Sequence, residues 1–399
     1  PAAGGASESA ALGMLDQQEE RLERLPQLAA PYEPDTVDLA ANAEQRAAWL
    51  AALERSTHEL VALAERGALL LLDSPSSSPD DAGTAAAAAE VAKMRGFASL
   101  YARHLQRLGA QPLAYGALTV RGLLALREQC LRQVGLGDVF GAVKRRENEK
   151  AMEAFREVLS ASDALAGRER VLALLKNVLA GNMFDWGASQ LREALADGSL
   201  DLAAARARIN YGPPRLNNPE VFAERVTERP YGRVVVFVDN SGADIVLGVL
   251  PLARHLVLAG AVVVLAANSQ PALNDVTETE LRRVVDRAAA LDAPLADALA
   301  RARLLVCATG SAGPCVDLRR LDPHLVALAR DADLVVLVGM ARAIVSNFNA
   351  RFACDSLRVA VFKNKMAAEA AGVAAFDSLC LFVPAGAAAA DGASRAGEP

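Results

Sequence analysis

The chain has 399 residues, 52% of them hydrophobic, which is enough to build the core of one large or two ordinary domains. Its formal net charge of -6 offers no basic surface for nucleic acid, no apolar run is long enough to span a membrane, and the first residues lack a signal-peptide pattern. The five cysteines form no CxxC pair, so they favour neither a disulfide framework nor a zinc site. We therefore expect a cytoplasmic protein without nucleic acid or a membrane as its partner, and, because residue 1 is proline, a fragment of a longer chain.

Residues 1–30 are expected to be unstructured or to form one short helix, since residues 1–12 are small and polar and Leu15–Leu28 fits a short charged helix. Residues 31–230 are predicted to form a mainly helical domain. Helical apolar spacing recurs over Asn42–Leu72, Glu90–Leu108, Thr119–Val134, Ala151–Leu159 and Arg168–Leu179.

Several features punctuate these helices. The low-complexity residues 74–89 are predicted to be an exposed loop, and Thr119 is the predicted N-cap of its helix. The mixed charges of Lys144–Lys150 are interpreted as a solvated helix face. Residues 180–188 indicate a corner between helices, where Asp185 either caps the second helix or carries function.

Residues 231–384 change to strands that alternate with helices. Strands are predicted at Val234–Val238, Ala261–Ala267, Leu304–Ala308, Leu334–Val338, Val359–Phe362 and Leu379–Val383, and helices are predicted to begin near Asp244, Asp275, Leu318, Ala341 and Met366. Such repeated units predict an α/β fold with a doubly wound, mainly parallel, Rossmann-like sheet. Residues 385–399 are expected to be an unstructured tail.

Polar residues directly follow two of these strands. Asp239, Asn240 and Ser241 come after the first strand, and Asp275 comes after the second. Because ligands of open α/β sheets bind at the carboxyl ends of strands, Asp239, Asn240 and Asp275 are candidate oxygen ligands for Mg²⁺ or Mn²⁺. In the alternative reading these residues only cap the following helices, and Asp275 with Glu278 fits a variant of the capping box.

Later strand ends offer groups for an anion. Residues 309–311 (TGS) and 339–342 (GMAR) are glycine-containing turns that lead into helices, which favours backbone N–H groups directed at a phosphate. Lys363 follows another strand and either holds a phosphate as a point charge or simply closes the strand. There is no Walker A loop, GxGxxG or GxSxG, and the four histidines are scattered.

Separated motifs resemble the metal-dependent damage-control phosphatases, a family formerly described as a domain of unknown function. These motifs are AGNMFDWGA, VDNSGADIVLGVLPLARHL, NSQPALNDVT and the GMAR segment followed by CDSLRVAVFKN. PYEPDTVDL, QPLAYGALTVRGLLALREQCL and TGSAGPCVDLRRLD resemble the branch that forms the phosphatase half of pantothenate-kinase-related fusion proteins.

This resemblance covers Pro31 to Pro384 and implies a helical amino-terminal region packed on an α/β domain. It also implies hydrolysis of small phosphomonoesters supported by Mg²⁺, Mn²⁺, Co²⁺ or Ni²⁺. The implied substrates are 4′-phosphopantetheine and its oxidised or damaged forms, and the implied covalent partner is a kinase-like domain.

The motifs also carry residue roles. The resemblance implies Asp239, Asn240 and Asp275 as metal ligands, Asp239, Asp275 and Lys363 as catalytic residues, and Asn182, Asp185, Ser241, Asp244, Arg342 and Lys363 as substrate-binding residues. Relatives commonly read Glu-Gly-Met-Gly-Arg where this chain has Val338 to Arg342 with Val and Ala at the first and fourth positions. Losing an acidic group and a glycine there would alter the substrate pocket, lower the activity or shift the specificity.

Other functions are open at this point. Because Val338 and Ala341 depart from the family pattern, one alternative is a catalytically weakened domain that acts as a binding or regulatory module. Another alternative is a phosphatase for sugar phosphates. A carboxylate methyltransferase would need a glycine-rich loop after the first strand, but residues 239–244 (DNSGAD) contain one glycine. Direct attack by water and a phospho-enzyme on Asp239 both fit the sequence.

Overall fold

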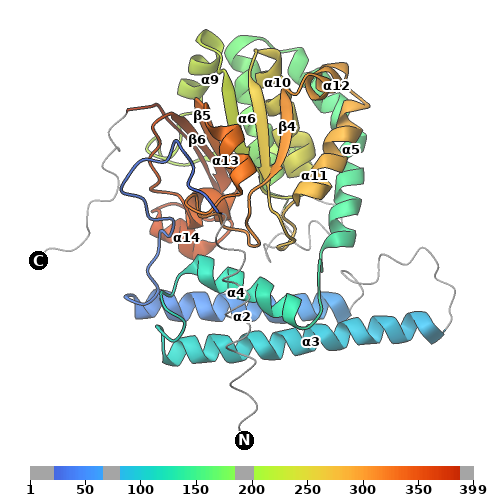
Figure 1. Ribbon diagram of the computed structural model, residues 1–399, viewed down its shortest axis with the longest axis vertical. Coiled ribbons are helices and arrows are strands. Elements are labelled where there is room, and N and C mark those ends of the chain that lie inside the picture. Colours follow the sequence, from blue (N-terminus) through green and yellow to red (C-terminus); the bar gives the residue numbers. More distant parts are fainter. Residues whose placement is uncertain (1–21, 66–80, 185–201, 387–399) are drawn as a thin grey trace, which may run out of the picture.

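The computed structural model describes residues 22–65, 81–184 and 202–386, and a seven-stranded sheet forms the centre of this part of the chain (Figure 1). The strands are β1 Asn210–Tyr211, β2 Arg233–Phe237, β3 Val262–Ala267, β4 Leu304–Ala308, β5 Leu334–Val338, β6 Asp355–Val361 and β7 Asp377–Val383. Their order is β1-β7-β6-β5-β2-β3-β4, and every neighbouring pair is parallel except β6 and β7. The predicted α/β fold with a mainly parallel, doubly wound sheet is confirmed, although the short β1 was not predicted.

The direction of winding reverses between β2 and β5. From β2 the chain proceeds outward to β3 and β4, and it then returns to β5 on the other side of β2. In sheets of this kind the loops beside such a switch point separate and leave a crevice at the carboxyl ends of the strands. The topology therefore places a binding crevice beside the ends of β2 and β5.

Each central strand is buried on both faces, as its uninterrupted apolar sequence predicts. Val234 and Val236 of β2 belong to one apolar cluster, whereas Val235 and Phe237 belong to another on the opposite face. The same alternation holds for β3 and β5. The sheet is thus the middle layer of the fold.

Helices supply the outer layers. The described helices are α2 Ala43–Glu65, α3 Asp81–Ala110, α4 Val120–Gln133, α5 Gly141–Asp163, α6 Gly167–Asn182, α8 Leu202–Arg208, α9 Pro219–Glu228, α10 Leu250–Leu258, α11 Glu278–Ala289, α12 Ala293–Ala300, α13 Pro323–Ala329 and α14 Lys365–Ala370. Residues of α5, α6 and α9 to α12 share the first cluster, and α13 and α14 contribute to the second. Helices α2, α3 and α4 lie together across one end of the sheet (Figure 1).

Two short π-helices follow strands of the switch point. They are η2 Asp244–Val249, which continues into α10, and η3 Ala341–Val345. The predicted helix starts near Asp244 and Ala341 are therefore right in position, but both first turns are wider than an α-helix. Such segments occur often at functional sites. None of the helices in the described ranges combines the length and apolar character needed to cross a membrane.

Three predictions about the first half of the chain need correction. Residues 22–28 are not helical: they form a turn at residues 26–27 between two isolated bridges, Glu23 with Leu321 and Leu28 with Phe352, and Leu25 and Leu28 are buried in the second cluster. Residues 81–89, predicted as a loop, are the first part of α3, since alanine is the best helix former. The predicted loop residues 74–80 lie outside the described part of the chain.

Lys144 is the third correction, because it does not lie on a solvated helix face. Its ammonium group is buried and pairs with Asp138 at 2.6 Å and with Glu280 at 2.8 Å, which joins α5 to α11. The predicted cap at Thr119 is confirmed, since its side chain accepts from the N–H of Gly122. The predicted division at residue 230 stays a prediction, and α5, α6 and α9 share the core of the sheet.

Candidate active site at the switch point of the sheet

Two loops at the carboxyl edge of the sheet bring Asp239 and Asp275 together. The N–H of Val276 donates to the carbonyl of Asp239 at 2.9 Å, and the N–H of Ser241 donates to the carbonyl of Asn274 at 2.9 Å. Asn240 and Asp275 form an antiparallel bridge between the two loops. The structure therefore brings together the three residues that the sequence suggests as metal ligands.

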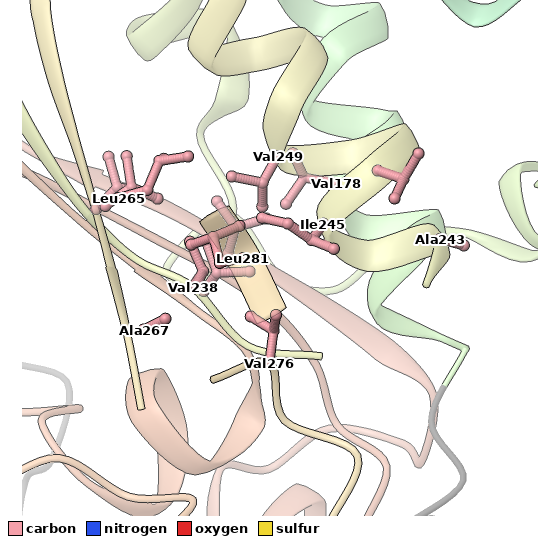
Figure 2. Packing of buried hydrophobic residues seen from close by; sticks show 14 of the residues in the cluster. Val178, Val238, Ala243, Ile245, Val249, Leu265, Ala267, Val276 and Leu281 are labelled. Carbon is pink, nitrogen blue, oxygen red and sulfur yellow. The ribbon is translucent and has the colours of Figure 1, made fainter. Parts of the chain in front are cut away.

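Buried apolar neighbours hold these loops in place. Val238, Val276 and Ile245 directly adjoin Asp239, Asp275 and Asp244 in the sequence, and all three lie in the first apolar cluster (Figure 2). Each apolar anchor faces the core while its acidic neighbour stays at the edge of the sheet. A buried apolar neighbour thus anchors the backbone next to each carboxylate.

Asp275 is not a helix cap, so the structural alternative for this residue is wrong. Helix α11 begins after Thr277, whose hydroxyl accepts from the N–H of Glu280 while the Glu280 carboxylate accepts from the N–H of Thr277. This is a complete capping box two residues further along. The Asp275 carboxylate is left available for the site.

Arg342 connects the two carboxylates. Its guanidinium is only 1% exposed and donates to Asp239, to Asp275 at 2.9 Å and to the side-chain Oδ1 of Asn268 at 2.8 Å. The Asn268 amide also donates to Asp275 at 3.0 Å. The two acidic groups therefore share one buried positive charge.

Gly339 makes this approach possible. Its φ of +93° lies in the region that favours glycine, and a Cβ atom at this position would lie 2.0 Å from Cγ of Asp239. No other residue type fits beneath the Asp239 carboxylate without displacing it. The glycine of the GMAR segment is therefore a steric requirement of the site.

Asn182 supports the site from the helical side. Its amide Nδ2 donates to Asp239 at 2.9 Å and to Asp244 at 2.8 Å, while its Oδ1 accepts from the N–H of Val361 at 3.2 Å. Asn240 also donates to both carboxylates, at 2.9 Å and 3.1 Å. Burial, reinforced by the charge of Asp239, raises the pKa of Asp244 to about 7.

Lys363 lies at the end of the neighbouring strand β6. Its ammonium group is buried and donates to the backbone carbonyl of Asn182 at 2.9 Å. It lines the same cavity as Asp239 and Asp275. The role of Lys363 in holding a phosphate stays a prediction.

This cavity, which we call the site cavity, has a volume of about 560 Å³ and lies between the sheet edge and the helical layer. Asp239, Asn240, Asp275 and Lys363 line it from the sheet. Its other walls come from α2, α4 and α14 and include Trp49, Arg55, Ser56, Glu59, Arg127 and Met366. The size is that of a pocket for a small metabolite.

The remaining candidates lie behind the cavity or outside the described residues. Asn182, Asp244 and Arg342 do not line it, but each bonds to a residue that does. Ser241 faces a small separate space beside Lys144, and its buried hydroxyl oxygen has no hydrogen-bond partner among the described residues. Asp185 belongs to the part of the chain that the structure does not describe.

The glycine N–H groups of the two predicted anion-binding turns are already paired. The N–H of Gly339 donates to the carbonyl of Val359 at 2.9 Å, and the N–H of Gly310 donates to the Ser269 hydroxyl at 2.8 Å. These two groups are therefore not donors for a phosphate, and anion binding by the other N–H groups of the turns stays a prediction.

Sequence reasoning missed Asn268 and the cavity residues of α2 and α4. Asn268 follows β3 directly, so its position at a strand end was a usable signal. Arg55, Ser56 and Arg127 gave no signal, because each lies in an ordinary helical pattern and meets the site only through tertiary packing.

The donor set fits a hard divalent cation. Two carboxylates and one amide suit Mg²⁺ or Mn²⁺, which commonly take one or two carboxylates and complete their shell with water and substrate phosphate. Within the described ranges no cluster of three or more His, Cys, Asp or Glu side chains is placed to hold a metal. Arg342 supplies the positive charge that balances Asp239 and Asp275.

Comparisons with known proteins identify relatives of this chain. The damage-control phosphatase ARMT1-like domain matches residues 24–379. A pantothenate kinase 2 of Arabidopsis thaliana is 38% identical over 380 residues, covering 87% of this chain and 40% of the relative. A 4′-phosphopantetheine phosphatase of Mus musculus is 36% identical over 410 residues, covering 90% of this chain and 48% of the relative. This chain therefore spans less than half the length of these two relatives.

A shorter relative and a solved structure complete the comparison. A damage-control phosphatase of Arabidopsis thaliana is 38% identical over 293 residues, which cover 73% of this chain and 79% of the relative. The crystal structure of a DUF89 family protein from Pyrococcus horikoshii superposes with a TM-score of 0.56 at 14% identity, covering 84% of this chain and 96% of that one, and so supports the fold alone. The chain therefore belongs to the damage-control phosphatase family with the ARMT1-like domain.

Proposed function

We propose that this chain is a metal-dependent phosphatase that hydrolyses 4′-phosphopantetheine and its oxidised or damaged forms. The observation that carries the proposal is the meeting of Asp239, Asn240, Asp275 and Lys363 at the wall of one cavity, at the switch point of the sheet. The relative from Mus musculus is named for 4′-phosphopantetheine, which supports the substrate class.

In this proposal Asp239, Asn240 and Asp275 hold Mg²⁺, Mn²⁺, Co²⁺ or Ni²⁺. A bound divalent cation supplies positive charge that stabilises the phosphoryl oxygens as the ester bond breaks. Lys363 binds the phosphate from β6 and adds a second positive charge. Asn182 and Asn240 hold the Asp239 carboxylate, and Arg342 keeps Asp239 and Asp275 at a fixed separation.

The proposal extends to the setting of the enzyme. All five cysteines are free thiols, which supports a reducing, cytoplasmic location. The two long relatives, one of them named as a pantothenate kinase, support a kinase-like domain as a covalent partner in the full-length protein.

Release of phosphate from a panel of esters tests the function. We expect turnover of 4′-phosphopantetheine above that of sugar phosphates in the presence of Mn²⁺ or Co²⁺, and none in EDTA. Asp239→Ala is expected to abolish both turnover and metal binding measured by calorimetry. Asp286→Ala, an exposed carboxylate on α11, is the matched control and should retain both.

Two results would overturn the proposal. Metal-dependent turnover retained by Asp239→Ala would remove Asp239 from the metal site. No turnover of any ester by the wild-type protein would instead favour a binding module, in which Val338 and Ala341 have weakened the site. Val338 is buried in the core and Ala341 lines the cavity. Of the two departures from the family pattern, only Ala341 would therefore face a ligand.

A further inference from the structure

A second cavity of about 810 Å³ adjoins the site cavity, and we call it the side groove. The two cavities meet along Ala48, Trp49, Val345, Met366 and Glu369, which line both. Asp239, Asp275 and Lys363 line the site cavity alone. A ligand whose phosphate lies at Lys363 therefore has the side groove beside its other end.

The walls of the side groove combine apolar surface with side-chain amides. Its apolar residues include Val37, Ile344 and Phe348, and its amides come from Asn42, Gln45 and Asn349. Apolar walls accept methylene and methyl groups, and a few amides can hydrogen-bond to both the N–H and the C=O of a ligand.

The charges of the side groove do not suit a second phosphate. Arg215 is the sole cation among its described lining residues, and its guanidinium already donates to the carbonyl of Ala371. Glu44 and Glu369 lie on the same walls and repel an anion. The charges of the side groove therefore disfavour a second anion, and its apolar walls and amides fit an uncharged occupant.

We propose that the side groove binds the unphosphorylated arm of the substrate, an extended and uncharged chain of aliphatic segments and amides. This inference rests on the proposed phosphatase function, which places the phosphate at Lys363. The arm then passes Trp49 and Met366 and runs between α2 and α14.

The side groove is open to solvent along part of its wall. Asn42 and Asn349 line it and are exposed. A part of the arm that lies beside these residues is therefore not enclosed, so oxidation of that part is expected to cost little binding energy.

Gln45→Trp tests the side groove, since Gln45 lines it without lining the site cavity. Filling the groove is expected to lower kcat/KM for 4′-phosphopantetheine about tenfold or more, while kcat/KM for p-nitrophenyl phosphate stays within about twofold. His58→Trp, at an exposed position of the same helix that lines neither cavity, should leave both values unchanged. Equal losses for the two esters, or no loss for either, would refute the inference.

A binding measurement separates this inference from the phosphatase proposal and does not depend on the Gln45→Trp variant folding. Pantetheine, which has the arm without the phosphate, is titrated into the wild-type protein while tryptophan fluorescence is recorded. We expect a saturable change that disappears in Trp49→Phe, because Trp49 lines both cavities. No saturable change at millimolar pantetheine would refute the side groove as the arm site, even if the enzyme proved to be a phosphatase.

Discussion

Replacing Arg342 by methionine should destabilise the metal-free protein and make it depend on metal. The guanidinium is 1% exposed and bonds to Asp239, Asp275 and Asn268, so its removal leaves two buried carboxylates without their counter-charge. Breaking a buried ion pair from one side typically costs about 3–5 kcal/mol. Methionine keeps much of the side-chain volume, so the loss reports on charge rather than on a cavity.

A divalent cation at the same carboxylates should offset part of this loss. Binding to the folded state alone stabilises a protein by about 2.7 kcal/mol at a hundred times the dissociation constant. Urea unfolding in EDTA and in saturating Mn²⁺ measures both quantities. We expect the gain from Mn²⁺ to be larger in Arg342→Met than in the wild-type protein, because in the wild-type protein Arg342 already offsets part of the negative charge of Asp239 and Asp275.

Arg358→Met is the matched control for this experiment. Arg358 is also buried, but its guanidinium donates to the backbone carbonyls of Asn347 and Ala350 rather than to a carboxylate. Its replacement should destabilise the protein in EDTA and in Mn²⁺ by the same amount. The reasoning fails if Mn²⁺ stabilises the wild-type protein and Arg342→Met equally, or if Arg342→Met is as stable as the wild-type protein in EDTA.

Three further substitutions test the supporting structure. Gly339→Ala should lower kcat about a hundredfold by displacing Asp239. Gly260→Ala is the control, because Gly260 is also at positive φ but has open space at its Cβ, and it should keep its activity. Equal activities of the two variants would contradict the steric argument. Gly181→Ala should lower the free energy of unfolding by about 1–3 kcal/mol, because its Cβ would lie 2.8 Å from the carbonyl oxygen of Ala243. Gly96→Ala, on an open helix surface, is the control and should not destabilise the protein. The same change for both variants in urea unfolding would refute this. Burial and then nearby Arg170 lower the pKa of His255, so the unfolded state takes up a proton first as the pH falls below about 6.5 and the protein loses stability there. His255→Gln should reduce this loss in urea unfolding, and an unchanged pH profile would refute it.

The sheet and the first half of the site were predictable because both follow from local sequence. Uninterrupted β-branched runs identified the central strands, and a polar residue directly after such a run must lie at the strand end, as Asp239 and Asn240 do. Asp275 needed one further step, since it follows β3 by eight residues and reaches Asn240 only through the pairing of the two loops.

The cavity walls were not predictable, because they depend on how distant elements pack. Arg55 and Arg127 occupy positions in α2 and α4 that any helical pattern allows, and nothing local directs them toward the sheet. Lys144 shows the same limit, since Arg145 and Arg146, which follow it in the charged run, are exposed, while its own partners, Asp138 and Glu280, come from a preceding loop and from α11. A charged residue in a charged run is interpreted as solvated unless its distant partners are known.

Asn182 explains why a helix from the first half of the chain belongs to this site. Helix α6 ends at Asn182, and the glycine before it lets the helix backbone contact η2 directly, because any Cβ there would meet the Asp244 Cα at 2.8 Å. At that distance a single amide reaches both Asp239 and Asp244, which would otherwise be two neighbouring buried acids with fewer donors between them. In the Gly-Asn motif at the end of α6, the glycine allows close packing and the asparagine stabilises the buried charges. The Asp239 carboxylate, which follows β2, thus depends on a residue 57 positions earlier in the chain.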